Sequence, residues 1–368
     1  MLHNNGLNGV VMKSVKKLSL MLLLGALSLE AGDVSLSKRF LIGTYTVKSG
    51  KVMNVEEIAT LSVKEHHSLL LDALQNSNWQ DVIKQANIII KNFPGTPFAQ
   101  EAFYFLGTAY FNLQDFDIAN QHLASYLKKQ TALQHFREAI ELKFQIAEKF
   151  REGYRKHIGG YELLPKWMPA KDESIKIYDE VISALPNDDL AARSLFGKGV
   201  LQLEDNEFTA SVETYQTLIR RFPKHALAPN AYVEIARVYL IQSQEKYPDA
   251  DYLDLAAINL RKFRQDFPLD PRIEEAEKIF SLMQEVFAQS FYEIAQFYER
   301  TKKPHASILY YSKIIKTFPN TKSAELSKKR LKVLRPAGDT PSHETEPAVL
   351  PIPEPEGSDL SISAVHPS

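Results

Sequence analysis

Cysteine is absent from all 368 residues of this chain. Its absence excludes structural disulfides, thiolate zinc sites, iron–sulfur clusters and cysteine nucleophiles. It also excludes a lipid joined to a cysteine side chain within these residues. Any association with a membrane therefore needs another means.

The chain also lacks an excess of one charge: it has 44 basic and 45 acidic side chains, and its formal net charge is −1. A nucleic-acid-binding domain usually carries a basic excess, so we expect no nucleic-acid partner. The 44% hydrophobic and 24% charged residues are ordinary for a folded globular protein.

Long apolar runs are missing apart from Leu18–Leu29 near the N-terminus. Basic residues precede this run, small residues close it, and Met12 is an alternative start. That order predicts a secretory signal peptide over residues 1–31. The run is short for a membrane span, which needs ~20 apolar residues. An uncleaved anchoring helix is the alternative interpretation. Either interpretation places the rest of the chain outside the cytoplasm.

The stretch Leu195–Pro223 has the pattern of two packed antiparallel helices. Gly199 is placed for a close helix crossing, and Phe208 opens the second helix. Pro223 ends the unit because proline cannot continue a helix. The pattern resembles a tetratricopeptide repeat, which spans about 34 residues.

The same spacing can be laid over residues 55–334 six times, which predicts an all-α tetratricopeptide-repeat solenoid of about six helical hairpins. Gly107 precedes Ala119 by the same offset that separates Gly199 from Ser211. A shared offset is harder to obtain by chance than a shared composition.

Four segments flank or interrupt the repeats. Residues 32–54 form an N-terminal extension, in which Lys38–Lys51 is either a short β-hairpin or an extended tether. Gly153–Lys171 is an insert whose glycines and prolines break any helix, and such inserts often form contact surfaces. A last helix, Lys322–Leu334, is predicted to cap the stack. The proline-rich residues 335–368 predict a disordered tail.

Catalytic, cofactor-binding and metal-binding signatures are not found. Gly197-Lys198-Gly199 lies inside a predicted helix, so we interpret its glycines as packing residues and not as a phosphate-binding loop. His66 and His67 are adjacent, point about 100° apart on a helix and have no clustered carboxylates, so we interpret them as surface histidines. We expect a non-enzymatic binding protein without a cofactor or a metal.

Two stretches carry a resemblance to a known family. Residues 76–129 begin NSNWQDVIKQANIIIKNFPGTPF, with Trp79 after a polar turn and an aromatic-Pro ending. Residues 291–331 begin FYEIAQFYERTKKPHASILYY. With these two ends, the region from about 56 to 334 resembles the outer-membrane protein assembly factor BamD family. The chain departs from that family in lacking its N-terminal lipidated cysteine and in having six hairpins where the family usually has five.

The resemblance implies a scaffold in the periplasm, at the periplasmic face of the outer membrane. It implies two protein partners, the β-barrel component of the assembly machine and unfolded outer-membrane proteins. The groove of the first two repeats would be the substrate site, with His67, Tyr104, Thr108 and Phe111. The last repeat would contact the barrel component, with Tyr292, Gln296, Glu299 and Arg300.

Two other functions stay open on the sequence. One is a periplasmic repeat protein that coordinates cell-wall synthesis with envelope constriction. Such proteins often carry a coiled coil before the repeats, and residues 32–55 show no heptads. The other is an enzyme with a helical superstructure, such as a cell-wall hydrolase, for which no motif is present.

Overall fold

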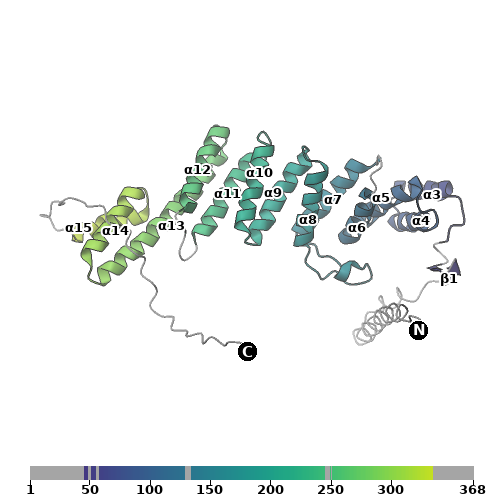
Figure 1. Cartoon of the computed structure of the whole chain (residues 1–368), viewed down its shortest axis with the longest axis horizontal. Helices are drawn as coiled ribbons and strands as arrows, with labels where there is room; N and C mark the ends of the chain where they lie inside the picture. Colours follow the sequence, from purple (N-terminus) through teal and green to yellow (C-terminus); the bar gives the residue numbers. More distant parts are fainter. Residues whose placement is uncertain are drawn as a thin grey trace, which may run out of the picture. The chain divides into compact units, whose positions relative to one another are not determined.

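The computed structural model describes residues 45–48, 51–54, 58–128, 134–244, 249 and 251–334. The predicted signal peptide and the predicted tail lie outside these residues. The chain divides into two compact units, Met1–Asp205 and Asn206–Ser368, and each is described by itself (Figure 1).

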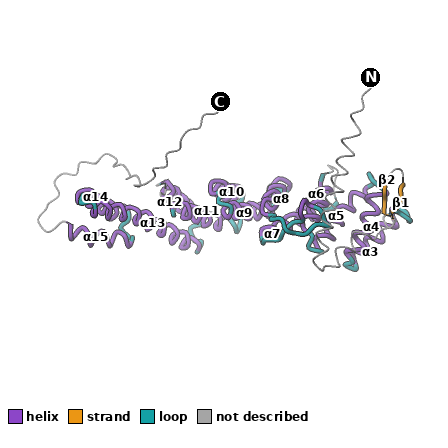
Figure 2. The backbone as a smooth tube through the Cα atoms, turned by 90° about the horizontal axis from the view of Figure 1, so that it is seen from below, coloured by secondary structure: helices purple, strands orange, loops and turns teal. Residues whose placement is uncertain are grey.

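The first unit contains a β-hairpin and seven α-helices within its described residues. A β-hairpin is present, but its bounds differ from the predicted Lys38–Lys51: β1 pairs antiparallel with β2, Tyr45 lies opposite Asn54, and the second strand begins at Lys51. Figure 2 shows helices forming most of the described chain. The bounds are β1 Tyr45–Lys48, β2 Lys51–Asn54, α3 Val63–Gln75, α4 Trp79–Asn92, α5 Pro97–Asn112, α6 Phe116–Leu127, α7 Phe136–Arg151, the short 3-10 helix η2 Ile158–Gly160, α8 Lys171–Ala184 and α9 Asp189–Glu204.

The second unit contains six α-helices within its described residues. They are α10 Phe208–Arg221, α11 Ala228–Ser243, α12 Asp251–Asp266, α13 Arg272–Arg300, α14 Pro304–Thr317 and α15 Lys322–Leu334. The consecutive hairpins make this chain an α-helical solenoid of tetratricopeptide repeats, as predicted. No helix among the described residues is both long and apolar enough to cross a membrane.

One turn geometry recurs between the two helices of a repeat. Four of these turns place a non-glycine residue in the left-handed region, with φ between 53° and 62°. These residues are Ser77, Gln114, Asn206 and Lys302. Left-handed backbone costs a residue with a Cβ atom about 1 kcal/mol, so the repeat geometry outweighs the local preference at these positions.

Glycines permit two close helix contacts in the first unit. A Cβ atom on Gly107 of α5 would lie 2.6 Å from Leu123 Cδ2 of α6, and one on Gly197 of α9 would lie 2.6 Å from the Tyr178 hydroxyl of α8. The interpretation of Gly197 as a packing residue is therefore confirmed. Gly199 is buried as well, but α9 and α10 belong to different units, so its predicted crossing with the second helix of that repeat stays a prediction.

The helix α13 is a single 29-residue helix that contributes side chains to two hydrophobic clusters of the second unit. Its first turns, with Ala276 and Ile279, pack with Tyr232 and Phe263 of α11 and α12. Its second half packs with α14 and α15 around Tyr311. The helix Arg272–Arg300 thus belongs to the fifth hairpin's core and the sixth hairpin's core at once.

The predicted cap helix is confirmed as α15. Its first turn is held by Glu285 of α13, whose carboxylate accepts hydrogen bonds from the backbone N–H groups of Lys322 (2.7 Å) and Ser323 (3.1 Å). A carboxylate at a helix N-terminus satisfies unpaired N–H groups and complements the helix dipole.

Candidate binding surfaces

A carboxylate between two imidazoles marks the face formed by α3, α5 and the start of α7. The Glu101 carboxylate lies 2.9 Å from His67 Nε2 and 3.3 Å from His135 Nε2. These three side chains are 17–23% exposed, so a ligand can reach them without any rearrangement of the core. We call His67, Glu101, Tyr104, Thr108 and His135 the Glu101 face.

Tyr104 gives the Glu101 face its aromatic surface. Its ring stacks on the His135 ring at a centroid distance of 4.4 Å and an angle of 10°. Burial raises the pKa of the Tyr104 phenol, so its hydroxyl is protonated at neutral pH. Stacking holds the ring still, which lowers the entropy cost of using it to bind a partner.

The structure brings three of the four predicted substrate residues together and separates the fourth. His67 contacts Glu101, and Tyr104 stacks on His135. The Thr108 hydroxyl donates to the Tyr104 carbonyl oxygen (3.1 Å). Phe111 lies at the end of the same helix stripe and packs edge-on against Phe116, with centroids 5.5 Å apart. Phe111 therefore contributes to packing at the edge of the face.

The sequence analysis missed Glu101 and His135. Glu101 could have been found, because it precedes Tyr104 and Thr108 at helical spacing on one stripe of α5. His135 comes from the next repeat, after residues that carry no periodic signal, so the sequence gives no indication of its place.

The candidate contact at the end of α13 needs a correction. Tyr292 is only 8% exposed and its ring packs against that of Tyr311, with centroids 5.4 Å apart. It belongs to the core of the sixth hairpin, because α14 covers the side of α13 on which it lies. The prediction of Tyr292 as a partner-contacting side chain is wrong on this geometry.

Glu299 is also engaged within the chain. Arg330 of α15 forms an ion pair with it, and the Tyr311 hydroxyl donates to it at 3.0 Å. The hydrogen bond from Arg330 lowers the pKa of Glu299, so the carboxylate stays ionised. Among its neighbours, Gln296 is half-buried, Arg300 is exposed and Phe297 is 38% exposed. Gln296, Phe297 and Arg300 are therefore accessible to a partner at this end of α13.

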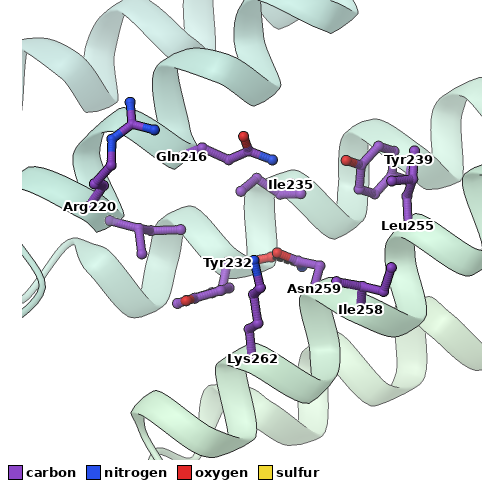
Figure 3. A pocket seen from close by; sticks show the side chains of 10 residues that line it. Gln216, Arg220, Tyr232, Ile235, Tyr239, Leu255, Ile258, Asn259 and Lys262 are labelled. Carbon is purple, nitrogen blue, oxygen red and sulfur yellow. Dashed lines mark hydrogen bonds between the residues drawn. The ribbon is translucent and has the colours of Figure 1, made fainter.

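A third surface is a groove of about 350 Å³ formed by α10, α11 and α12 (Figure 3). It is mostly apolar and two of its side chains, Leu255 and Ile258, are 41% and 39% exposed. In this view Arg220 lies at the left, Lys262 lies near the middle beside Tyr232 and Asn259, and Tyr239 and Leu255 lie at the right. We call it the α11 groove, and its lining is Gln216, Ile219, Arg220, Tyr232, Ile235, Tyr239, Leu255, Ile258, Asn259 and Lys262.

Hydrogen bonds fix the insert Gly153–Lys171 to the first unit, and the buried ones among them join His157 to Asp117. The Asp117 carboxylate of α6 accepts hydrogen bonds from the His157 backbone N–H (3.0 Å) and from His157 Nδ1 (2.8 Å). Outside this attachment the insert exposes two aromatic side chains, Tyr161 at 62% and Trp167 at 67%. The insert is therefore an attached projection with a partly aromatic surface.

Metal binding has no support in the described part of the chain, where no group of three or more histidine, cysteine, aspartate or glutamate side chains is arranged to hold an ion. The interpretation of both histidines of α3 as surface residues is wrong for His66. It is 3% exposed, and its Nδ1 lies 2.8 Å from the Gln85 side-chain oxygen of α4. His66 faces α4 because it shares a helix face with Leu70 and Ala73.

Comparison with known proteins gives one family match. Residues 202–337 match the model of a family described as "YfiO: Outer membrane lipoprotein". The matched range runs from the last turn of α9 to the end of α15 and is less than half of the chain. A search of curated proteins returns no match.

Solved structures give further matches, among them two that are described as tetratricopeptide-repeat proteins, YrrB and a protein from Parabacteroides merdae. MamA from Desulfovibrio magneticus RS-1 is 15% identical, with 57% of this chain and 97% of that chain covered and a TM-score of 0.33. YrrB, described as having an unusual peptide-binding site, is 10% identical, with 59% and 92% covered and a TM-score of 0.35. A protein from Parabacteroides merdae is 13% identical, with 74% and 98% covered and a TM-score of 0.33.

The helix hairpins therefore define a tetratricopeptide-repeat protein, a class whose surfaces mostly bind other proteins. Within that class, its C-terminal part is similar to the outer-membrane lipoprotein family named above.

Proposed function

We propose that this chain is a non-enzymatic scaffold at the periplasmic face of the outer membrane, where it holds protein partners during the assembly of β-barrel proteins. The observation that carries this proposal is the match of residues 202–337 to a family of outer-membrane lipoproteins. The resemblance of the repeat region to the BamD family points to the same compartment and role.

The Glu101 face is the proposed site for an unfolded outer-membrane protein. A rigid Tyr104 ring offers an aromatic anchor of the kind that dominates many protein interfaces. Glu101 and the imidazoles beside it offer partly exposed hydrogen-bonding groups for the backbone of an extended segment. A surface with both properties suits many sequences, as a substrate site for different barrel precursors requires.

The end of α13 is the proposed contact with the barrel component. Arg300 and Phe297 are exposed, and Gln296 lies one turn before Arg300. The ion pair of Glu299 with Arg330 holds this end of α13 against α15, so these side chains stand on a fixed helix. Fixed side chains lose less entropy when a partner binds.

The first experiment is a crosslinked pull-down of the full-length protein from its own envelope fraction, with mass spectrometry of the partners and of the bait's N-terminal peptide. Recovery of an outer-membrane β-barrel protein is the expected result. Recovery of cell-wall synthases without a barrel protein would overturn the proposed function and favour the role in envelope constriction.

Site variants test the two surfaces separately. A photo-crosslinking residue at Thr108 should capture unfolded barrel precursors, whereas one at exposed Lys84 of α4 should not. Arg300→Glu should reduce capture of the barrel component about tenfold, as expected for an interface residue worth more than 1 kcal/mol. Lys278→Glu is the matched control, because Lys278 is an exposed basic residue on the same helix. Equal losses in both variants would discard this contact.

A further inference from the structure

The α11 groove combines apolar side chains with two basic ones. Its lining includes two basic residues, Arg220 and Lys262, and no acidic residue. The nearby Asp266 carboxylate accepts a hydrogen bond from the Tyr232 hydroxyl at 2.6 Å, so a protein group already occupies it. A ligand that suits this groove combines apolar side chains with nearby acidic ones.

The chain contains such a segment. Residues 349–356 read Val-Leu-Pro-Ile-Pro-Glu-Pro-Glu, with an apolar half followed by two glutamates. The surrounding residues 335–368 hold six acidic residues and one basic residue, a net charge of −5 with histidine neutral. We propose that the α11 groove binds residues 349–356 of its own chain.

Proline chemistry favours this occupant. Pro351, Pro353 and Pro355 each fix φ near −65°, which biases the segment toward a polyproline II helix before it binds. A segment that is already extended loses little conformational entropy when it docks. The apolar contacts available to it are the exposed side chains of Leu255 and Ile258, because the two tyrosines of the lining, Tyr232 and Tyr239, are only 3% and 6% exposed.

The connection is long enough. The cluster that contains Tyr232 packs on the first turns of α13, whereas Arg330 near the end of α15 pairs with Glu299 near the end of α13. The distance from the end of α15 to the α11 groove is therefore close to the length of α13, which is about 43 Å for 29 residues. The 18 residues from Leu334 to Ile352 reach up to about 60 Å when extended. Intramolecular attachment also gives the segment a high effective concentration at the groove.

The proposal goes beyond the scaffold role, because it concerns neither the Glu101 face nor the end of α13. A docked segment covers the exposed Leu255 and Ile258 side chains.

The absence of cysteine makes a direct test available in the full-length chain. The variant Gln216→Cys with Ser358→Cys places one thiol in the groove and one just beyond the segment, and leaves every charge in place. Treatment with a short bis-maleimide should join the two within one chain. The control is Lys328→Cys with Ser358→Cys: Lys328 is exposed on α15, close to the start of the connection, so an undocked segment would meet it at least as often.

The expected result is an intramolecular crosslink at least about fivefold faster for the groove pair than for the control pair. Adding Arg220→Glu and Lys262→Glu should slow it about fivefold through loss of two exposed ion pairs, and adding Glu354→Lys and Glu356→Lys should restore it. Circular dichroism checks that each variant keeps its helices.

Three results would overturn the proposal. The first is equal crosslinking of the groove and control pairs. The second is an effect of the groove charges that the reversed glutamates do not restore. The third is a product only between two chains, which would mean that the segment occupies a second copy. None of these results bears on recovery of a barrel protein, so the scaffold role and this inference can fail independently.

Discussion

Asp117→Ala is expected to loosen the part of the insert around His157 from α6 while leaving the repeats folded, because Gln121 of α6 still donates to the Gly160 carbonyl oxygen (3.1 Å). The Asp117 side chain is 7% exposed and accepts two hydrogen bonds from His157, one from the backbone N–H and one from the ring. A hydrogen bond to a charged group contributes about 1.5–3 kcal/mol, so the pair of bonds is worth at most about 3–6 kcal/mol. Because the insert leaves and re-enters the helices between α7 and α8, the loss should appear as local opening.

Hydrogen exchange at the His157 amide measures this opening directly, because that amide donates to Asp117. A loss of about 3 kcal/mol corresponds to roughly 150-fold faster exchange of this amide, with amides in the middle of α6 unchanged. Asp117→Asn keeps one oxygen acceptor and should show an intermediate effect. Trypsin should also cut after Arg155 sooner in the alanine variant. Unchanged exchange at His157 in Asp117→Ala would refute the assignment of this pair as the attachment.

Three further predictions concern stability and are read from chemical denaturation of the full-length chain. Gly107→Ala should lower the free energy of unfolding by about 1–3 kcal/mol through overlap with Leu123, and adding Leu123→Ala should remove the overlap, so that the double variant loses less than the sum of the two single variants. Burial lowers the pKa of His122 to about 4 from about 6.5, so the unfolded chain takes up the proton first. The free energy of unfolding should therefore fall by up to about 3 kcal/mol as pH drops from 6.5 to 4, and His122→Phe should flatten that dependence. Lys302→Gly should stabilise the chain by up to about 1 kcal/mol, because glycine adopts the φ of 57° without strain, and a loss of stability there would contradict the turn geometry.

Helix boundaries were predictable wherever local chemistry set them. Residues 136–151 and 322–334 are helical as predicted, since turn residues or prolines flank both segments. The phenylalanine before Pro223 and the one before Pro319 each cap a helix, because proline disfavours helical backbone in the residue before it. These are short-range effects that one sequence contains in full.

Which side of a helix is covered was less predictable. His66 and Tyr292 carry polar atoms and fit a surface pattern, yet α4 covers the first and α14 the second. The partners of a helix, and the side they approach, depend on repeat packing that periodicity along one helix does not specify. Glu101 shows the same limit, because His135 belongs to a later helix.

The α11 groove was not predictable from periodicity for a related reason. Leu255 and Ile258 extend the apolar face of α12, so the pattern assigns them to the core. They are nevertheless partly exposed, because the helices on either side of α11 leave the groove open between them. Whether an apolar side chain is covered depends on the spacing of helices, which a sequence pattern does not report.

The shared helix α13 changes how the end of the solenoid responds to force and to denaturant. In a regular repeat array each hairpin contacts only its neighbours, so terminal hairpins can fray one at a time. Here the fifth and sixth hairpins are joined by one rod of 29 residues that supplies side chains to both cores. Fraying of α14 and α15 uncovers half of this rod while the other half stays anchored. A force applied to α15 is therefore transmitted along α13 to the core that this helix forms with α11 and α12.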